Sequence, residues 1–205
     1  MTAKIKLNAA SGGGSFSLQA PSTSSNNRVF TLPDVADATL LTSNSSTGKL
    51  LQVQSTTKTD TFTHSNLAES TFSNAPMSVS ITPSNASNKI LIRVEAVVST
   101  FVADTRISMG IFKAGSIISG ATGDASGSRN PATAETYQDI QASAETISAE
   151  YLDTAGGTSA ITYDIRFMHS QGGGANLYLN RSGLDHNSIG YYRTVSTMTA
   201  MEIAA

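Results

Sequence analysis

The sequence of 205 residues contains no cysteine and no tryptophan. Without cysteine, the chain has no disulfides, no thiolate ligand for a metal and no cysteine nucleophile. Its stability must therefore come from packing or from association of subunits. A domain of about 150 residues can bury roughly 68–70% of its unfolded surface, so the chain is long enough for a core of its own and an appendage.

Charge is also scarce. Lys and Arg number 13, Asp and Glu number 15, the net charge is −2, and charged residues make up 14% of the chain, against roughly 25% on average. No basic surplus is available to neutralise phosphates, so nucleic-acid binding is disfavoured. The first ten residues include Lys4 and Lys6 and lack the apolar centre of a signal peptide, and no stretch approaches the ~20 apolar residues of a membrane span. These features predict a soluble protein made in the cytoplasm, without membrane insertion.

Hydroxyl side chains take the place of the missing charges, with 30 Ser and 25 Thr. Thr, Val, Ile, Tyr and Phe are common while Lys and Glu are sparse, which favours strands over helices. Disorder is the alternative for a chain rich in Ser, Thr and Gly. We reject it for most of the length because long alternating apolar segments recur after Met77. The composition therefore predicts an all-β fold.

The N-terminal segment, residues 1–57, contains strand-sized pieces of four or five residues at 4–7, 15–18, 28–32 and 49–53. Stretches rich in Gly, Pro, Asn and Ser separate them and predict turns. So few apolar side chains cannot close a core within one chain. The segment is either a flexible tail or a short-stranded β stalk that wraps with copies of itself. We favour a three-fold intertwined stalk because the strands alternate cleanly and recur.

The C-terminal segment, residues 58–205, carries longer alternating strands. In the strongest of them, Ile90, Ile92 and Val94 share one face, and Glu95 lies on the other. The number and spacing of the strands predict an antiparallel jelly-roll β-sandwich as a compact head. The expected strands are at 77–83, 89–99, 106–112, 117–118, 146–152, 160–169, 176–180 and 193–203.

Two of the later strands are each expected to present one continuous face. These faces comprise Ile161, Tyr163, Ile165 and Phe167 in the first strand, and Val195, Thr197, Thr199, Met201 and Ile203 in the second. Two polar stretches, 120–136 and 182–193, lack strand periodicity. We expect them to be the long loops of the head, and binding groups usually lie on such loops.

No catalytic, cofactor or metal site is predicted. The histidines His64, His169 and His186 are far apart, and His64 falls in the expected connector, whereas a metal site usually has short ligand spacings. Ser182, Asp185 and His186 could suggest a hydrolase. However, no Gly-x-Ser-x-Gly turn is present, and a polar loop is the simpler interpretation.

Two further groups are candidates for binding rather than catalysis. Asp104 and Asp124 lie in expected loops and could contribute to a cation site, although no Asp-x-Asp-x-Asp-Gly run occurs. Tyr191 and Tyr192 form an aromatic pair in a loop, and such side chains often contact carbohydrate or protein. The alternative for the tyrosines is packing at a subunit interface.

Several phrases of the sequence also carry a family resemblance. KIKLN at 4–8, GGGSFSLQAP at 12–21 and FTLP at 30–33 resemble a module at the start of marine phage virion proteins. The phrases at 123–129, 151–153, 179–182 and 196–203 resemble a head domain of cyanophage and other marine phage structural proteins. That head is similar to the trimeric jelly-roll heads of the complement-C1q and tumour-necrosis-factor type. The resemblance implies a virion component and a homotrimer.

These features predict a non-enzymatic bacteriophage virion protein, a tail fibre or fibre-tip protein that contacts the host surface. A capsid decoration or head fibre without a receptor role is the first alternative. A glycan-degrading enzyme is less favoured, because depolymerases usually need a longer repetitive β-helix with clustered acidic residues. The expected partners are two further copies of the chain, another tail or capsid protein bound through the N-terminal segment, and a host surface glycan or protein. The expected contact residues are Arg129, Tyr137, Asp185, His186, Tyr191, Tyr192 and Arg193.

Overall fold

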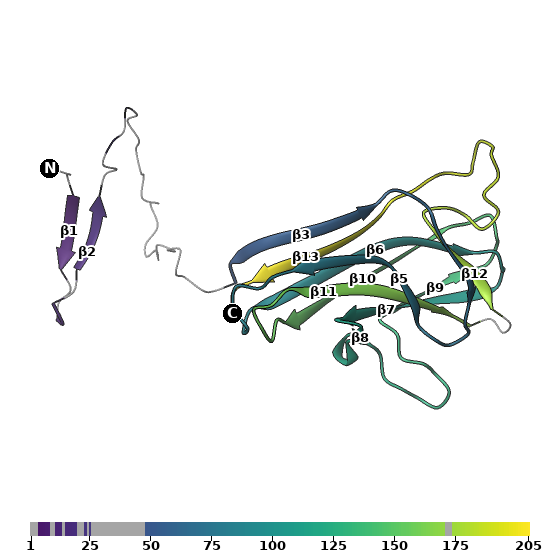
Figure 1. Cartoon of the computed structure of the whole chain (residues 1–205), viewed down its shortest axis with the longest axis horizontal. Helices are drawn as coiled ribbons and strands as arrows, with labels where there is room; N and C mark the ends of the chain where they lie inside the picture. Colours follow the sequence, from purple (N-terminus) through teal and green to yellow (C-terminus); the bar gives the residue numbers. More distant parts are fainter. Residues whose placement is uncertain are drawn as a thin grey trace, which may run out of the picture. The chain divides into compact units, whose positions relative to one another are not determined.

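The computed structural model describes residues 4–8, 11–13, 15–19, 23, 25, 48–170 and 174–205 (Figure 1). The chain divides into two compact units, Met1–Ser43 and Asn44–Ala205.

The first unit contains an antiparallel hairpin of β1 (Lys4–Asn8) and β2 (Ser15–Gln19). The turn between them uses Gly12 and Gly13 at φ of 84° and 73°, a conformation that glycine adopts without strain. The two strands confirm the first two predicted pieces, and the piece predicted at 28–32 lies outside the described residues. Ile5 and Leu7 are 65% and 60% exposed, and an isolated two-stranded hairpin is marginally stable in water.

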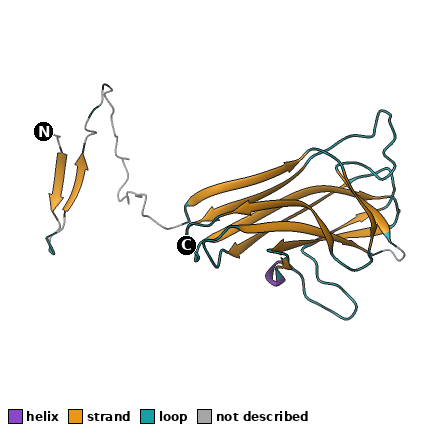
Figure 2. Cartoon of the chain, in the orientation of Figure 1, coloured by secondary structure: helices purple, strands orange, loops and turns teal. Residues whose placement is uncertain are grey.

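The described residues of the second unit form strands joined by loops, with one turn of 3₁₀ helix (Figure 2). Its elements are β3 (Leu50–Lys58), β4 (Phe62–Leu67), β5 (Ser73–Ile81), β6 (Lys89–Thr100), β7 (Thr105–Lys113), β8 (Ser116–Ile117), η1 (Ser119–Ala121), β9 (Ala134–Gln138), β10 (Glu145–Thr154), β11 (Ile161–His169), β12 (Ala175–Leu179) and β13 (Ser196–Ile203).

These strands form two antiparallel sheets. In sheet I, β6 is the central strand. One edge of β6 pairs with β10, and the other edge pairs first with β13 and then, near its end, with β12. The two outer strands are β3, which pairs with β13, and β4, which pairs with β12. In sheet II the order is β5, β11, β7, with β8 and β9 both on the far side of β7. From β4 to β7, and again from β9 to β12, successive strands alternate between the six-stranded sheet I and the five-stranded sheet II, which is the winding of a jelly roll. The predicted all-β, antiparallel jelly-roll sandwich is confirmed.

The core lies between the two sheets. Ile90, Ile92 and Val94 of β6 are at most 1% exposed, as their alternation predicts. The predicted face of β11 is also confirmed, because Tyr163, Ile165 and Phe167 are buried. Each of these side chains points into the space between the layers, where apolar surface is removed from water.

Strand β13 buries the face opposite to the one that its apolar residues suggested. The residues 195, 197, 199, 201 and 203 do share a face, but that face points away from the core. The buried face holds Ser196, Met198, Ala200 and Glu202. Two of these four are polar, so hydrophobic periodicity alone did not identify the face.

The head also begins earlier than expected. The predicted boundary after Thr57 falls inside β3, and β3 pairs with β13 along its whole length. β4 was expected to be part of a connector, yet it pairs with β12, and His64 lies opposite Leu177. The stretch expected as a loop at 120–136 ends in β9, which pairs with β7. All three differences come from pairing with strands distant in sequence.

Candidate functional site

The head has two distinguishable ends. At the base end β3 begins, β13 finishes, and the register sets Ile203 against both Leu50 and Lys89. At the distal end β6 finishes, and Thr100 pairs with Leu177 of β12. The chain therefore enters the jelly roll at the base end. The connection between β12 and β13, residues 180–195, lies toward the distal end (Figure 1).

This connection is a closed surface loop, here called the distal loop (residues 181–193). Its neck is Asn180, which is fully buried and has φ of 61°, a backbone conformation that asparagine tolerates better than most residues. The Asn180 amide donates to the carbonyl oxygens of Lys58 and Asp60 at 2.8 and 2.9 Å and accepts from the Ser196 hydroxyl at 2.6 Å. The Thr194 N–H donates to the Asn180 carbonyl, so both ends of the loop meet at one residue, as in an Ω-loop.

Behind the neck, the distal loop lies directly against the end of the sandwich. A side chain at Gly183 would place its Cβ 2.2 Å from the Thr100 carbonyl oxygen, so this close approach needs glycine. The Leu184 N–H donates to the Gln141 carbonyl at 3.1 Å. The loop thus packs against the end of β6 and is hydrogen-bonded to the β9–β10 connection.

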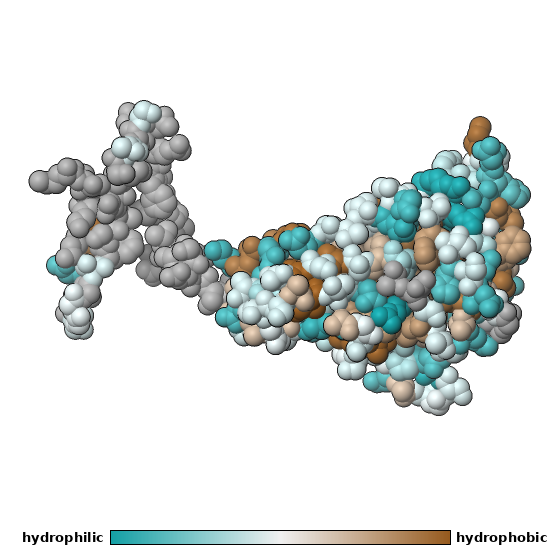
Figure 3. Space-filling view, in the orientation of Figure 1, coloured by the Kyte–Doolittle hydropathy of each residue, from teal (hydrophilic) through white to brown (hydrophobic). Residues whose placement is uncertain are grey.

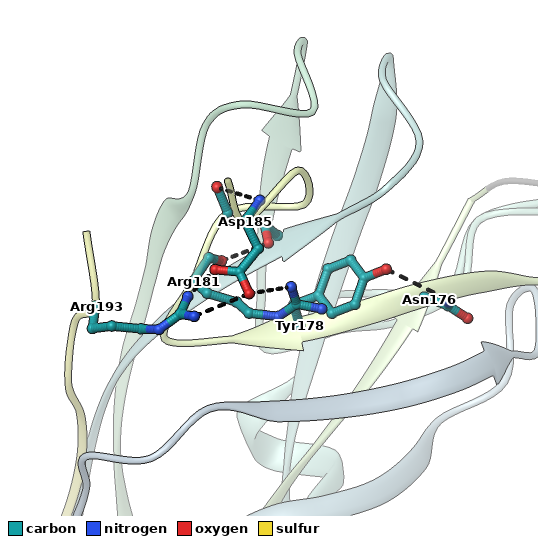
Figure 4. Close-up of polar contacts among 7 residues, drawn as sticks. Asn176, Tyr178, Arg181, Asp185 and Arg193 are labelled. Atoms are coloured by element: carbon teal, nitrogen blue, oxygen red, sulfur yellow. Dashed lines mark hydrogen bonds and ion pairs between the residues drawn. The ribbon is translucent and has the colours of Figure 1, made fainter. Parts of the chain in front are cut away.

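A charged clamp holds the outer part of the loop (Figure 4). The Asp185 carboxylate accepts from Arg193 through both guanidinium Nη atoms and lies 2.8 Å from Nη1 of Arg181. Arg181 in turn lies over the Tyr178 ring, 3.8 Å from its centroid. The hydrogen bonds from Arg193, reinforced by the charge of Arg181, lower the pKa of the Asp185 carboxyl below its ordinary value.

The clamp leaves aromatic and apolar side chains exposed on the loop. The rings of His186 and Tyr191 are tilted against each other with centroids 5.0 Å apart. Tyr192 is 73% exposed and Ile189 is fully exposed. A shallow groove of about 530 Å³ runs along 185–193. Aromatic side chains on a fixed frame lose little conformational entropy on binding, which suits them to contact a partner.

The other two predicted contact residues lie on the flank of sheet II. Arg129 donates to the Ser126 carbonyl and hydroxyl at 3.3 and 3.2 Å, and it lines an open groove of about 710 Å³ together with Arg106. Tyr137 of β9 is 46% exposed, donates to Asp104 at 2.8 Å and has the Arg106 guanidinium 5.4 Å from its ring centroid. The hydrogen bond to Asp104 raises the pKa of the Tyr137 hydroxyl.

The seven predicted contact residues therefore fall into two groups. Asp185, His186, Tyr191 and Arg193 line one groove and Tyr192 neighbours them, whereas the groove that holds Arg129 is lined by residues of the 123–132 stretch and sheet II. The sequence did not indicate the roles of Asn180, Arg181 and Gly183. The one local turn signal here was the pair Ser182-Gly183, which follows Asn180 and Arg181 at the end of a strand.

The residues that suggested a hydrolase have other contacts. The Ser182 hydroxyl accepts from the Asp185 N–H at 3.3 Å, and His186 stacks on Tyr191. His169 is buried, and its Nε2 lies 2.5 Å from the Leu67 carbonyl oxygen. Within the described ranges, no group of three or more His, Asp or Glu side chains is placed to hold a metal ion. No helix in that part of the chain is long and apolar enough to cross a membrane.

Comparisons with known proteins give structural neighbours only. No protein-family model matches the chain, and no curated protein does. A crystal structure of the infectious bursal disease virus VP2 subviral particle is similar with a TM-score of 0.41 and 16% identity, over 75% of this chain and 41% of that chain. A structure of T=1 particles derived from infectious bursal virus is similar with a TM-score of 0.41 and 15% identity, over 92% of this chain and 45% of that chain. The chain thus spans less than half the length of these solved chains.

Proposed function

We propose that this chain is a structural protein of a bacteriophage particle, a virion fibre or tail-associated protein whose distal loop contacts the host surface. One observation carries the proposal: the chain enters the jelly roll at the base end, and an anchored loop with exposed rings lies toward the opposite end. The base end then faces the particle and the distal loop faces outward. The N-terminal segment attaches to another virion protein, of the tail or of the capsid.

The role is non-enzymatic in this proposal. Ser182, Asp185 and His186 are each engaged in contacts that fix the shape of the distal loop. Asp185 in particular is held by two arginines, so its carboxylate acts as the anchor of the clamp. The loop is therefore suited to present a surface, and the ligand is a host surface glycan or protein.

The functional form in this proposal is a homotrimer. The hairpin of the first unit leaves Ile5 and Leu7 more than half exposed, and three copies of such short strands can cover these side chains in a shared stalk. Weak contacts by each distal loop would be multiplied by three-fold symmetry and by several fibres on one particle.

Replacing the exposed side chains of the distal loop tests the host contact. The double variant Ile189→Ser/Tyr192→Ala leaves the Asp185 clamp intact, and we expect adsorption of assembled phage to host cells to fall at least tenfold. A loss of about 1.4 kcal/mol is tenfold in affinity, and buried tyrosines in interfaces often exceed it. The measurement is the adsorption rate constant of particles that carry the variant in normal amount.

Ile117→Ser is the matched control, because Ile117 is 37% exposed on β8, on the flank of sheet II. Particles with this change should adsorb like the wild type. Normal adsorption by the distal-loop variant would reject the receptor role and favour capsid decoration.

A further inference from the structure

The outer face of sheet I carries apolar side chains in adjoining rows. The register aligns Val53, Met201, Leu91 and Leu152 across β3, β13, β6 and β10. The next row toward the base end contains Leu50 and Ile203, followed by Lys89 and Thr154, which are hydrogen-bonded at 2.8 Å. Side chains directly opposite each other in antiparallel strands lie about 4.5–5.5 Å apart, so these rows form one continuous surface.

The six side chains are only partly covered within the chain. Leu50, Val53 and Leu152 are 52%, 48% and 51% exposed, and Leu91, Met201 and Ile203 are half-buried. Figure 3 shows hydrophobic residues gathered at the end of the head where β3 begins and β13 finishes. Contiguous apolar patches on a soluble protein usually mark a surface that another molecule covers.

The next rows toward the distal end are polar and carry charges of both signs. Ser55 and Thr199 lie side by side, with their hydroxyls 3.1 Å apart. Arg93 stands opposite Glu150, and Glu95 lies on the same face of β6. Every copy of the chain carries both signs beside the apolar band, so the acidic side chains of one copy can meet Arg93 of a neighbouring copy around a three-fold axis.

We propose that the outer face of sheet I is the surface through which copies of this chain associate. The inference rests on the proposed homotrimer and specifies where its heads meet. Because the chain enters the head beside Leu50, a stalk that joins the N-terminal segments would also hold these base ends at high local concentration.

The size of the outer face of sheet I is in the range that a contact with another copy of the chain requires. Four strands about 4.8 Å apart and nine residues of about 3.3 Å each give a flat footprint of about 570 Å². A standard stable interface buries about 800 Å² of accessible surface per partner, and accessible surface exceeds a flat footprint because side chains project from it. The apolar band lies within that footprint, with a polar surround.

The absence of cysteine makes a direct test possible in the full-length chain. A Val53→Cys variant places a unique thiol in the apolar band, and a short bis-maleimide reagent then reports whether two copies meet there. We expect a cross-linked dimer band on a denaturing gel from Val53→Cys. Ile140→Cys, at a site 55% exposed in the β9–β10 connection, should give monomer only. Light scattering of the wild type should give three times 21.3 kDa, about 64 kDa.

A second change in the same row tests whether the apolar band holds the copies together. In Val53→Cys/Leu152→Glu we expect cross-linking to fall at least tenfold, because a carboxylate would be buried in the contact. Val53→Cys/Ile189→Glu adds the same charge in the distal loop and should cross-link normally.

The outcomes separate the two claims. A mass near 64 kDa without cross-linking at Val53, or cross-linking unaffected by Leu152→Glu, would overturn this interface and leave the trimer standing. A wild-type mass of 21.3 kDa would overturn the trimer and the interface together.

Discussion

Replacing Val94 by aspartate is expected to unfold the jelly roll. Val94 is 1% exposed at the centre of sheet I, between Met198 of β13 and Ala149 of β10. A carboxylate there would be surrounded by the buried apolar side chains of the core, so either it would be protonated or the sandwich would open. We expect a loss of about 4 kcal/mol or more, which is a large share of the 5–15 kcal/mol that stabilises a typical domain.

The measurement is the cooperative unfolding transition of the full-length chain, followed by circular dichroism in denaturant. Val195→Asp is the matched control, because the same change is made at a valine that is 52% exposed. It should shift the transition by less than about 1 kcal/mol. Similar losses at the two positions would mean that the space between the sheets is not the core.

Replacing Glu202 by glutamine should cost about 3 kcal/mol at pH 7. This carboxylate is fully buried at the base end and accepts from Gln52 Nε2 at 2.5 Å, Asn88 Nδ2 at 2.6 Å, and the Ser84 N–H and hydroxyl at 2.7 and 2.8 Å. Glutamine would turn an N–H₂ group toward these donors and remove the charge that strengthens the bonds.

The same contacts make the free energy of unfolding depend on pH. Burial alone would raise the pKa of Glu202, but the hydrogen bonds from Gln52, Asn88 and Ser84 outweigh it and lower the pKa from 4.5 to about 2. The unfolded chain therefore binds the proton more readily than the folded chain. The stabilisation, about 3 kcal/mol for this shift, is complete above pH 4.5 and is lost as the pH falls toward 2.

Denaturant unfolding at a series of pH values between 7 and 2 checks both statements. The wild type should lose stability across this window, and Glu202→Gln should show a correspondingly smaller loss. Asp139→Asn, at an exposed carboxylate in the β9–β10 connection, should behave like the wild type. An unchanged acid profile in Glu202→Gln would show that the buried carboxylate is not the group that titrates.

Local alternation predicted the strands that bury apolar residues at every second position. β6 and β11 are the clearest cases, because every second residue from Ile90 to Val98 and from Tyr163 to Phe167 is apolar and buried. The same rule failed for β13. There the outward face holds Met201 and Ile203, which are partly exposed, while the inward face contains Glu202. A buried glutamate is stabilised only by partners that the sequence does not place beside it.

The start of the head was missed for a similar reason. The β3 strand is short of apolar residues, and it is held by β13, which lies more than a hundred residues later. The stretch 182–193 could be chosen as a candidate contact loop from its sequence, because Tyr and Arg are common at binding surfaces, and its contact with the host stays a prediction. The clamp through Asp185 and the neck at Asn180 depend on contacts with Arg193, Lys58 and Asp60, which only the folded chain brings together.

Gold-labelled antibody against the full-length chain, applied to purified particles of the phage that encodes it, shows whether the chain is part of the particle and where it lies. We expect electron microscopy to place the label on the particle, at the tail or its fibres, and we expect antibodies raised against the distal-loop peptide 181–193 to bind intact particles. Label confined to the capsid would support the decoration reading instead. If the particles carry no label and do not contain the chain, the proposed role as a virion protein is wrong.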